Sequence, residues 1–198
     1  MLELAFCTAG GSKVVRLRGR STLVMCAVLA AALGLPAPRA RADAALEYAL
    51  KADYLPKFTA FITWPEAAFT SPGQPVTICV LGRDPFGNRL VESARGVRFG
   101  ERRIKILRLT APDPEAICHL LFISGDEAVA EGTLDAMKGK PVVTVTDSGL
   151  KAHGVISFLI EANHVRFDID NDAAARNGLV ISSKLLGLAH AVKQRGQP

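Results

Sequence analysis

The chain has 198 residues, of which 49% are hydrophobic, and a formal net charge of +5. The excess of positive charge lies within residues 1–42, which hold six basic residues and one acidic residue, whereas residues 43–198 hold 18 of each. The net charge is therefore no evidence for nucleic-acid binding. The remaining stretch of about 156 residues is long enough to bury the core of a single domain without extra cross-links.

Residues 1–42 have the three zones of a secretory signal peptide. A basic zone ends at Arg20, an apolar run of 14 residues spans Thr22 to Leu35, and Ala40-Arg41-Ala42 matches an A-x-A cleavage site. The alternative is an N-terminal transmembrane helix, but the apolar run is shorter than the roughly 20 residues that a membrane span needs. We therefore expect cleavage near Ala42, a mature chain that begins at Asp43, and a periplasmic location.

Two cysteines, Cys79 and Cys118, remain after the expected cleavage. An even pair in an exported chain favours a disulfide, which would stabilise the fold by about 4 kcal/mol in the chain-entropy model. The alternative is two buried free thiols. A metal-binding pair is disfavoured because neither cysteine lies in a C-x-x-C spacing.

An amphipathic helix is predicted over residues 44–62. Its apolar residues recur at spacings of four and three, which is typical of one buried helix face. Pro56 removes a helical hydrogen bond and predicts a kink, and the helix is expected to end before Trp64-Pro65. The expected core-facing stripe consists of Leu46, Leu50, Tyr54, Phe58 and Phe61.

Strands and helices alternate over the next 60 residues. Residues 75–81 are rich in β-branched side chains and predict a buried strand. A turn at Gly82–Pro85 leads into a short helix that reaches Ala94, with Asp84 as its N-cap. One or two strands are expected between Val97 and Leu109, and another buried strand from Cys118 to Ile123.

The last third begins with a helix and ends with helices. A capping box of Ser124 and Glu127 predicts a helix to about Lys138, which Gly139 ends. Further elements are then expected in this order: a strand at 142–146, a hairpin of 155–161 and 165–169, a short helix from an Asp170 cap to Asn177-Gly178, and a final helix striped by Ile181, Leu185, Leu188 and Val192.

This order of elements predicts an α/β fold with three layers. Strands that alternate with helices pair in parallel, so we expect a mostly parallel central sheet of five or six strands with helices on both faces. The domain is expected to span residues 43–198.

Motifs of the common enzyme classes were sought next. The chain has no G-x-S-x-G and no H-E-x-x-H sequence. Gly82 and Gly87 have the spacing of a phosphate-binding loop after a strand, but the Lys-Ser/Thr that would contact phosphate is missing. Because ligands bind at the carboxyl ends of strands in open α/β sheets, Gly82, Asp84 and Gly87 remain a candidate ligand loop.

The titratable residues do not suggest a metal site or a catalytic site. The histidines are scattered, without a helical i,i+4 partner. Asp168, Asp170 and Asp172 alternate, and capping of the next helix is the preferred role over calcium binding. We expect no enzyme activity, no cofactor and no metal, and the residues alone predict an exported α/β domain for sensing or binding. The four histidines are His119, His153, His164 and His190.

Four stretches together resemble the YfiR family of periplasmic regulators. They are the helix from Glu47 to Leu55 with Phe61-Ile62-Thr63-Trp64-Pro65, the strand and turn Val76–Gly82 with Asp84-Pro85-Phe86-Gly87, the strand Cys118–Ser124, and the tail from Val165 to Leu186. The resemblance covers about residues 45–193, with the blocks in the family's order.

The resemblance implies a function that the residues alone do not indicate. Proteins of this family repress an inner-membrane diguanylate cyclase of the YfiN type, and an OmpA-like lipoprotein of the YfiB type sequesters them. By resemblance we expect the same partners here, and a homodimer. Cys79 and Cys118 match one disulfide of the family, whereas the second family cysteine pair falls near His153 and Leu159–Ile160 and is absent here.

The hairpin and final helices resemble the family's partner surface, which makes Phe158, Arg166 and Asp168 candidate partner-binding residues. For Phe158 the alternative is a place in the core, because alternation along a strand buries every second residue. The alternative function is a periplasmic small-ligand-binding or sensor accessory protein that works with a histidine kinase or a transporter.

Overall fold

The computed structural model describes residues 38–113 and 115–196, and side chains from residue 42 onward. The basic zone and apolar run of the predicted signal peptide lie outside the described residues, and Ala40–Ala42 falls in the first turns of a helix. A compact unit begins at Ala42, and the following description concerns this unit. Within the described residues, no helix is both long and apolar enough to cross a membrane.

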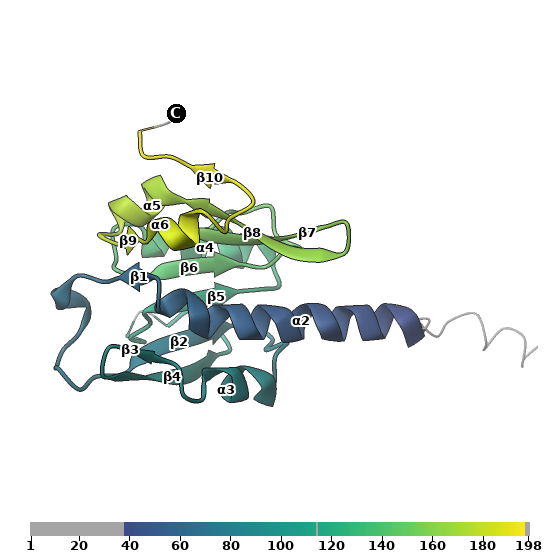
Figure 1. Cartoon of the computed structure of the whole chain (residues 1–198), viewed down its shortest axis with the longest axis horizontal. Helices are drawn as coiled ribbons and strands as arrows, with labels where there is room; N and C mark the ends of the chain where they lie inside the picture. Colours follow the sequence, from purple (N-terminus) through teal and green to yellow (C-terminus); the bar gives the residue numbers. More distant parts are fainter. Residues whose placement is uncertain (1–37, 114, 197–198) are drawn as a thin grey trace, which may run out of the picture. The chain divides into compact units, whose positions relative to one another are not determined.

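An eight-stranded sheet in the order β10-β8-β7-β6-β5-β2-β4-β3 forms the centre of the unit (Figure 1). The neighbours from β4 to β7 pair in parallel, whereas β3 and β8 run antiparallel to β4 and β7. This confirms the mostly parallel α/β sheet, which exceeds five or six strands because short strands extend both edges. The strands are β2 (Val76–Leu81), β3 (Arg98–Phe99), β4 (Arg102–Leu109), β5 (Leu120–Ile123), β6 (Val143–Thr146), β7 (Ile156–Glu161), β8 (His164–Asp170) and β10 (Val192–Lys193).

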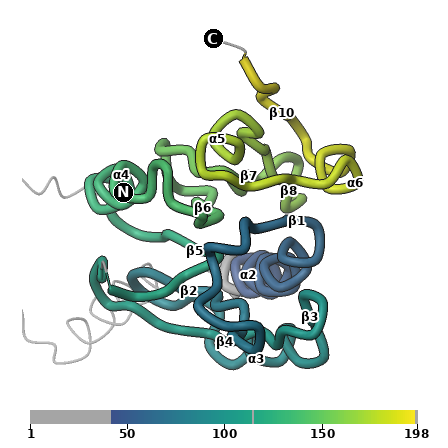
Figure 2. The backbone as a smooth tube through the Cα atoms, turned by 90° about the vertical axis from the view of Figure 1, so that its left-hand side faces the viewer, coloured from purple at the N-terminus to yellow at the C-terminus, as the bar shows by residue number. Residues whose placement is uncertain are grey.

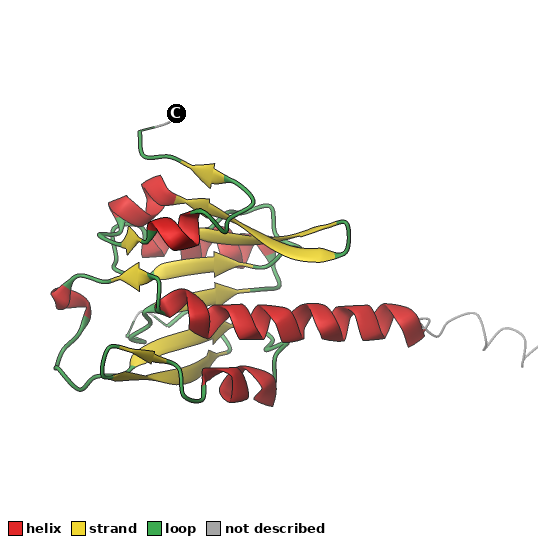
Figure 3. Ribbon diagram, in the orientation of Figure 1, coloured by secondary structure: helices red, strands yellow, loops and turns green. Residues whose placement is uncertain are grey.

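Helices cover both faces of the sheet (Figure 3), and two hydrophobic cores result. The larger core packs α2 and the C-terminal helices against one face, and the smaller core packs α4 against the other. Figure 2 shows α2 and α4 on opposite sides of the central strands. The helices are α2 (Pro38–Thr59), the 3-10 turn η1 (Glu66–Ala68), α3 (Asn88–Ala94), α4 (Glu127–Met137), α5 (Asn171–Arg176) and α6 (Ser183–Leu186).

Helix α2 buries a different face from the one that the spacing predicted. It continues through Pro56 and ends at Thr59. Phe58 is buried, but Leu46 and Leu50 are 62% and 41% exposed. A repeat of four residues advances by 400° on a helix of 3.6 residues per turn, so Leu46 lies about 120° around the helix from Phe58. The other buried positions of this stretch are Lys51, Ala52, Leu55 and Pro56, which lie on the side of Phe58 that faces away from Leu46.

Two predicted helix caps are replaced by neighbouring residues. Helix α3 begins at Asn88, because the Asp84 carboxylate accepts a hydrogen bond from the N–H of Phe86 (2.7 Å) and closes a local turn instead. Helix α4 is capped by Asp126, which accepts from the N–H of Val129 (3.1 Å), and not by Ser124. It ends where predicted, before Gly139 with φ +74°.

The predicted hairpin and the Asp170 cap are confirmed, whereas the long final helix is wrong. Asp170 accepts from the N–H of Ala173 at 2.7 Å, and α5 ends at Asn177-Gly178. Ile181 then pairs with Ile62 in a two-stranded sheet of β1 (Ile62–Thr63) and β9 (Val180–Ile181). These strand pairings outcompete the helical pattern of the tail.

Candidate functional site

The two remaining cysteines form a disulfide, as the sequence predicted. Cys79 lies in β2 and Cys118 two residues before β5, with their Cα atoms 5.7 Å apart. Cys79 is fully buried in the smaller core. The bond therefore joins a central strand to the segment that enters the next strand.

The candidate ligand loop is held by contacts of its own. Gly82 has φ +89°, and a Cβ atom there would lie 3.0 Å from the Ser124 carbonyl oxygen, which explains the glycine. The Asp84 carboxylate forms an ion pair with Arg108 Nε (2.6 Å), and Arg108 also donates to the Gly87 carbonyl oxygen (2.8 Å). Phe86 is buried against Phe122. A phosphate-binding loop would have hydrogen-bond donors at this position. This loop instead has the Asp84 carboxylate, which is already paired with Arg108.

A buried polar cluster lies where β6 ends. Lys51 of α2 has no exposed surface, and its amine contacts the Asp147 carboxylate (2.5 Å), the Ser148 hydroxyl (2.9 Å) and the Glu47 carboxylate. Tyr48 donates from its hydroxyl to the second oxygen of Asp147 at 2.9 Å. We call Glu47, Tyr48, Lys51, Asp147 and Ser148 the strand-end cluster.

Burial and charge determine the protonation of Tyr48 in the strand-end cluster. Burial, followed by the nearby Asp147 carboxylate, raises the pKa of Tyr48 well above its usual range. The phenol therefore stays protonated and donates to Asp147, while Lys51 compensates the carboxylates. The cluster anchors α2 to the carboxyl end of β6. Sequence reasoning missed it, because a lysine in a helix is usually exposed, although Asp147 directly follows a buried strand.

The three candidate partner-binding residues do not share a face of the hairpin. Phe158 pairs with Phe167, so both side chains lie on the face that meets α2, where Phe158 is 3% exposed and packs on Phe58. Arg166 and Asp168 lie on the opposite face. Asp168 bonds to His190 Nδ1 at 3.0 Å. Phe158 thus occupies the core position that was its alternative, whereas Arg166 is exposed.

An apolar stripe extends outward from the contact between α2 and the hairpin. Tyr54 contacts both Phe158 and Phe167, with ring centres 6.2 and 5.8 Å apart. Leu50 and Leu46 precede Tyr54 by one and two turns of the helix, on the same side. Ile160, 42% exposed, follows Phe158 on the same face of β7 and pairs with Val165. We call Leu46, Leu50, Ile160 and Val165 the outer apolar stripe.

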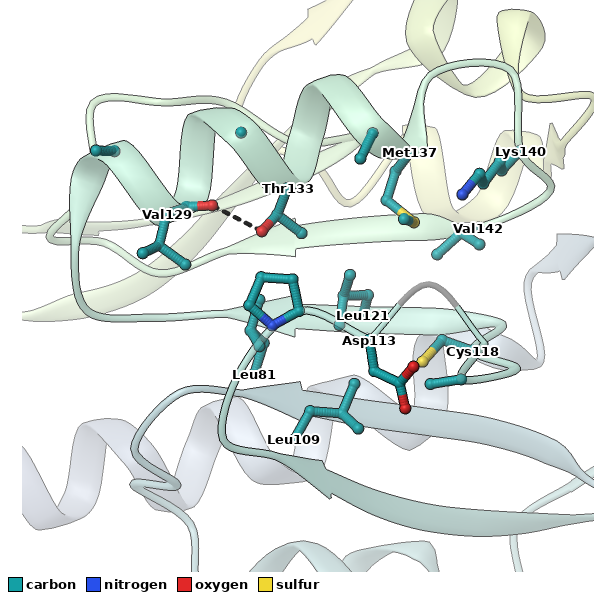
Figure 4. A pocket seen from close by; sticks show the side chains of 15 residues that line it. Leu81, Leu109, Asp113, Cys118, Leu121, Val129, Thr133, Met137, Lys140 and Val142 are labelled. Carbon is teal, nitrogen blue, oxygen red and sulfur yellow. Dashed lines mark hydrogen bonds between the residues drawn. The ribbon is translucent and has the colours of Figure 1, made fainter.

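Two further properties of the described residues bear on chemistry. No group of three or more His, Cys, Asp or Glu side chains there could hold a metal ion. A cavity of about 380 Å³, lined almost wholly by apolar side chains, lies beside α4 (Figure 4).

Comparison with known proteins adds one finding. The model of the YfiR/HmsC-like family matches residues 48–190, which is most of the compact unit. A search of curated proteins finds no match.

Proposed function

The chain belongs to the YfiR/HmsC-like family, and on this premise we propose that it is a periplasmic regulatory protein that represses an inner-membrane diguanylate cyclase. Its role is to bind the cyclase's periplasmic part and keep cyclic-di-GMP synthesis low. An OmpA-like lipoprotein of the YfiB type is the proposed antagonist, and a homodimer the proposed working form.

The observation that carries this proposal is the extent of the family match. The match begins at Tyr48 in α2 and ends at His190 before β10, so it includes the whole sheet except its last short strand. It therefore concerns the domain as a whole and not a shared local motif.

The outer apolar stripe is the surface that we propose for the cyclase. Exposed leucine and isoleucine side chains lie on two elements that pack together at Tyr54, and exposed apolar side chains that gather in this way mark protein interfaces. The neighbouring core holds the patch in place, because Tyr54 packs against the hairpin and Lys51 is bonded to Asp147.

The test is the cyclic-di-GMP content of the native host. Deletion of the gene is expected to raise it, and the exported protein is expected to restore it. The double variant Leu50→Glu/Ile160→Glu should still fold, with somewhat lower stability because both side chains are partly buried, and should fail to restore it, because it places charges on the stripe. Val180→Glu, at a 55% exposed position on β9, is the matched control and should restore it. No rise on deletion under several growth conditions would contradict the repressor role.

The second candidate is a ligand-binding sensor accessory that works with a histidine kinase or a transporter. The cavity beside α4 favours this candidate, because ligand sites are concave and mostly apolar. Under this alternative, deletion would leave cyclic-di-GMP unchanged and alter the output of the kinase or the uptake of the ligand.

A further inference from the structure

The face of the sheet that carries α4 is only partly covered by helix. In the described part of the chain, α4 is the one helix that contributes buried side chains to the smaller core. It contacts β6, while Leu81 of β2 and Leu109 of β4 line the open space beside it. A parallel sheet normally has both faces covered; here Cys79 and Leu81 of β2 are buried on this face, whereas Leu107 and Leu109 of β4 are only partly buried.

The cavity beside α4 is partly a result of small residues on this helix. Ala128, Gly132 and Ala136 of α4 line the cavity at helical spacing and are exposed, so they lie on its open side. A Cβ atom added to Gly132 would meet no atom within 4 Å. Met137 closes one end, and its flexible side chain adapts to occupants of different shape.

The polar groups of the cavity distinguish between possible ligands. The Thr133 hydroxyl donates to the Val129 carbonyl oxygen (2.7 Å), and the Asp113 carboxylate accepts from the N–H of Glu115 (2.9 Å). Lys140 forms no ion pair within residues 42–113 and 115–196, and its side chain extends toward Met137 at the rim (Figure 4). Asp113, which also has no ion-pair partner among these residues, lies on another wall of the cavity beside Cys118, so Lys140 is the one cation that the lining offers beside an apolar interior (Figure 4).

We propose that this cavity binds a free medium-chain fatty acid, with the chain between α4 and strands β2 and β4 and the carboxylate at Lys140. At roughly 30 Å³ for each water-sized group, 380 Å³ holds about a dozen non-hydrogen atoms, which is the size of decanoate. The volume lies within the range of about 300–1,000 Å³ that is usual for ligand sites.

The test is calorimetric titration of the exported protein with sodium decanoate below its micelle concentration. Saturable binding at one site per chain is expected. Decyltrimethylammonium, which has the same chain and the opposite charge, should bind several-fold more weakly. Lys140→Met should weaken decanoate binding by about threefold, the typical value of an exposed ion pair, and leave the binding of decanol unchanged.

A cavity-filling variant locates the ligand. Gly132→Leu should weaken decanoate binding about tenfold or more, because the loss of two buried methylene contacts is sufficient for that factor. Its melting temperature should be unchanged or higher, since the added side chain enters empty space and removes a helical glycine. Glu131→Leu is the matched control, because it adds a leucine to α4 at an exposed position outside the cavity.

Two results would overturn the proposal. If decanoate does not bind saturably, or binds Gly132→Leu as tightly as the parent protein, it does not occupy this cavity. A second copy of the chain would be the occupant if Gly132→Leu dissociated a dimer while decanoate left it intact in sedimentation. Neither result affects the repressor role, whose test uses cyclic-di-GMP and no added ligand.

Discussion

Lys51 is a fully buried lysine whose amine contacts the carboxylates of Glu47 and Asp147. Removing one member of a buried ion pair leaves an uncompensated charge and typically costs 3–5 kcal/mol. Lys51→Met should lower the free energy of unfolding by about 3 kcal/mol, the lower end of that range, because the Glu47 side chain is 25% exposed. Urea unfolding measures the change. Lys57→Met, at an exposed position of the same helix, should change little. Equal stability of the two variants would show that the strand-end cluster is not an anchor.

His119 is held as a neutral imidazole by its hydrogen bonds. Its Nδ1 accepts from the N–H of Thr77 (3.0 Å), so the proton lies on Nε2, which faces the Ala68 carbonyl oxygen (3.1 Å). Burial lowers the pKa of His119, and the nearby Arg102 acts in the same direction. Protonation of Nδ1 would place its N–H against the N–H of Thr77, so that two donors would meet without an acceptor.

This geometry predicts a loss of stability on mild acidification. Because the folded-state pKa of His119 is lower than its unfolded-state value near 6.5, the unfolded chain takes up the proton first. The contribution of His119 to the free energy of unfolding is fully present above the unfolded-state pKa and is lost as the pH falls through the folded-state pKa. Urea unfolding at pH 7.5 and pH 5 should show the decrease, and His119→Gln should reduce it. An identical decrease in the variant would assign it to other groups.

At the scale of elements, the disulfide is the strongest single constraint. Cys79 and Cys118 are 39 residues apart, and closing a loop of that length stabilises a fold by about 4 kcal/mol in the chain-entropy model. Cys79→Ala/Cys118→Ala should therefore lower the free energy of unfolding by roughly 3–4 kcal/mol. Thiol labelling of the denatured, unreduced parent protein should detect no free thiol, and labelling of both cysteines would contradict the bond.

The hairpin turn offers a stabilising change. Ala162 and Asn163 have φ values of 47° and 62°, the left-handed region that two-residue hairpin turns require. Alanine is poorly suited to this region, whereas asparagine tolerates it. Ala162→Asn should therefore stabilise the protein by about 0.5 kcal/mol, a rise of roughly 1–2 °C in melting temperature. A lower melting temperature would mean that the turn is not the two-residue form described.

At the scale of the whole molecule, the two cores share the same strands. Ile78 and Val80 of β2 face the larger core, and Cys79 and Leu81 face the smaller one. Because β2 is buried on both faces, loss of one core would remove the packing on one face of this central strand. Both cores should therefore unfold together.

A chain of residues 43–198 is therefore expected to unfold in a single transition. Fluorescence of Trp64, in the larger core, and far-UV circular dichroism should give the same midpoint in urea. Two separated transitions would contradict the coupling. The intact mass of the exported protein should correspond to a chain that begins at Asp43.

Local signals predicted the elements whose stability is local. The hairpin, the Asp170 cap and the end of α4 at Gly139 each depend on a few consecutive residues, and all three are confirmed. The α4 cap moved by two residues, from Ser124 to Asp126, because both residue types can cap a helix and the sequence alone does not rank them.

The candidate sites were less predictable, because they join distant segments. The strand-end cluster connects Lys51 to Asp147, which lie 96 residues apart. The cavity beside α4 exists because β2 and β4 lack a covering helix, which depends on strand order. The alternation that places Phe158 and Arg166 on opposite faces was visible in the sequence, but the face that meets α2 was not.

Residue types, their spacing and the order of blocks were sufficient to predict the α/β class, the disulfide and the likeness to YfiR proteins. The buried face of α2, the strands that contain Ile181 and Val192, and the carboxylate that contacts the buried Lys51 became known only from the folded structure. The physical reason is that burial and strand pairing depend on contacts between segments far apart in the chain. Such contacts override local preferences wherever those preferences are weak.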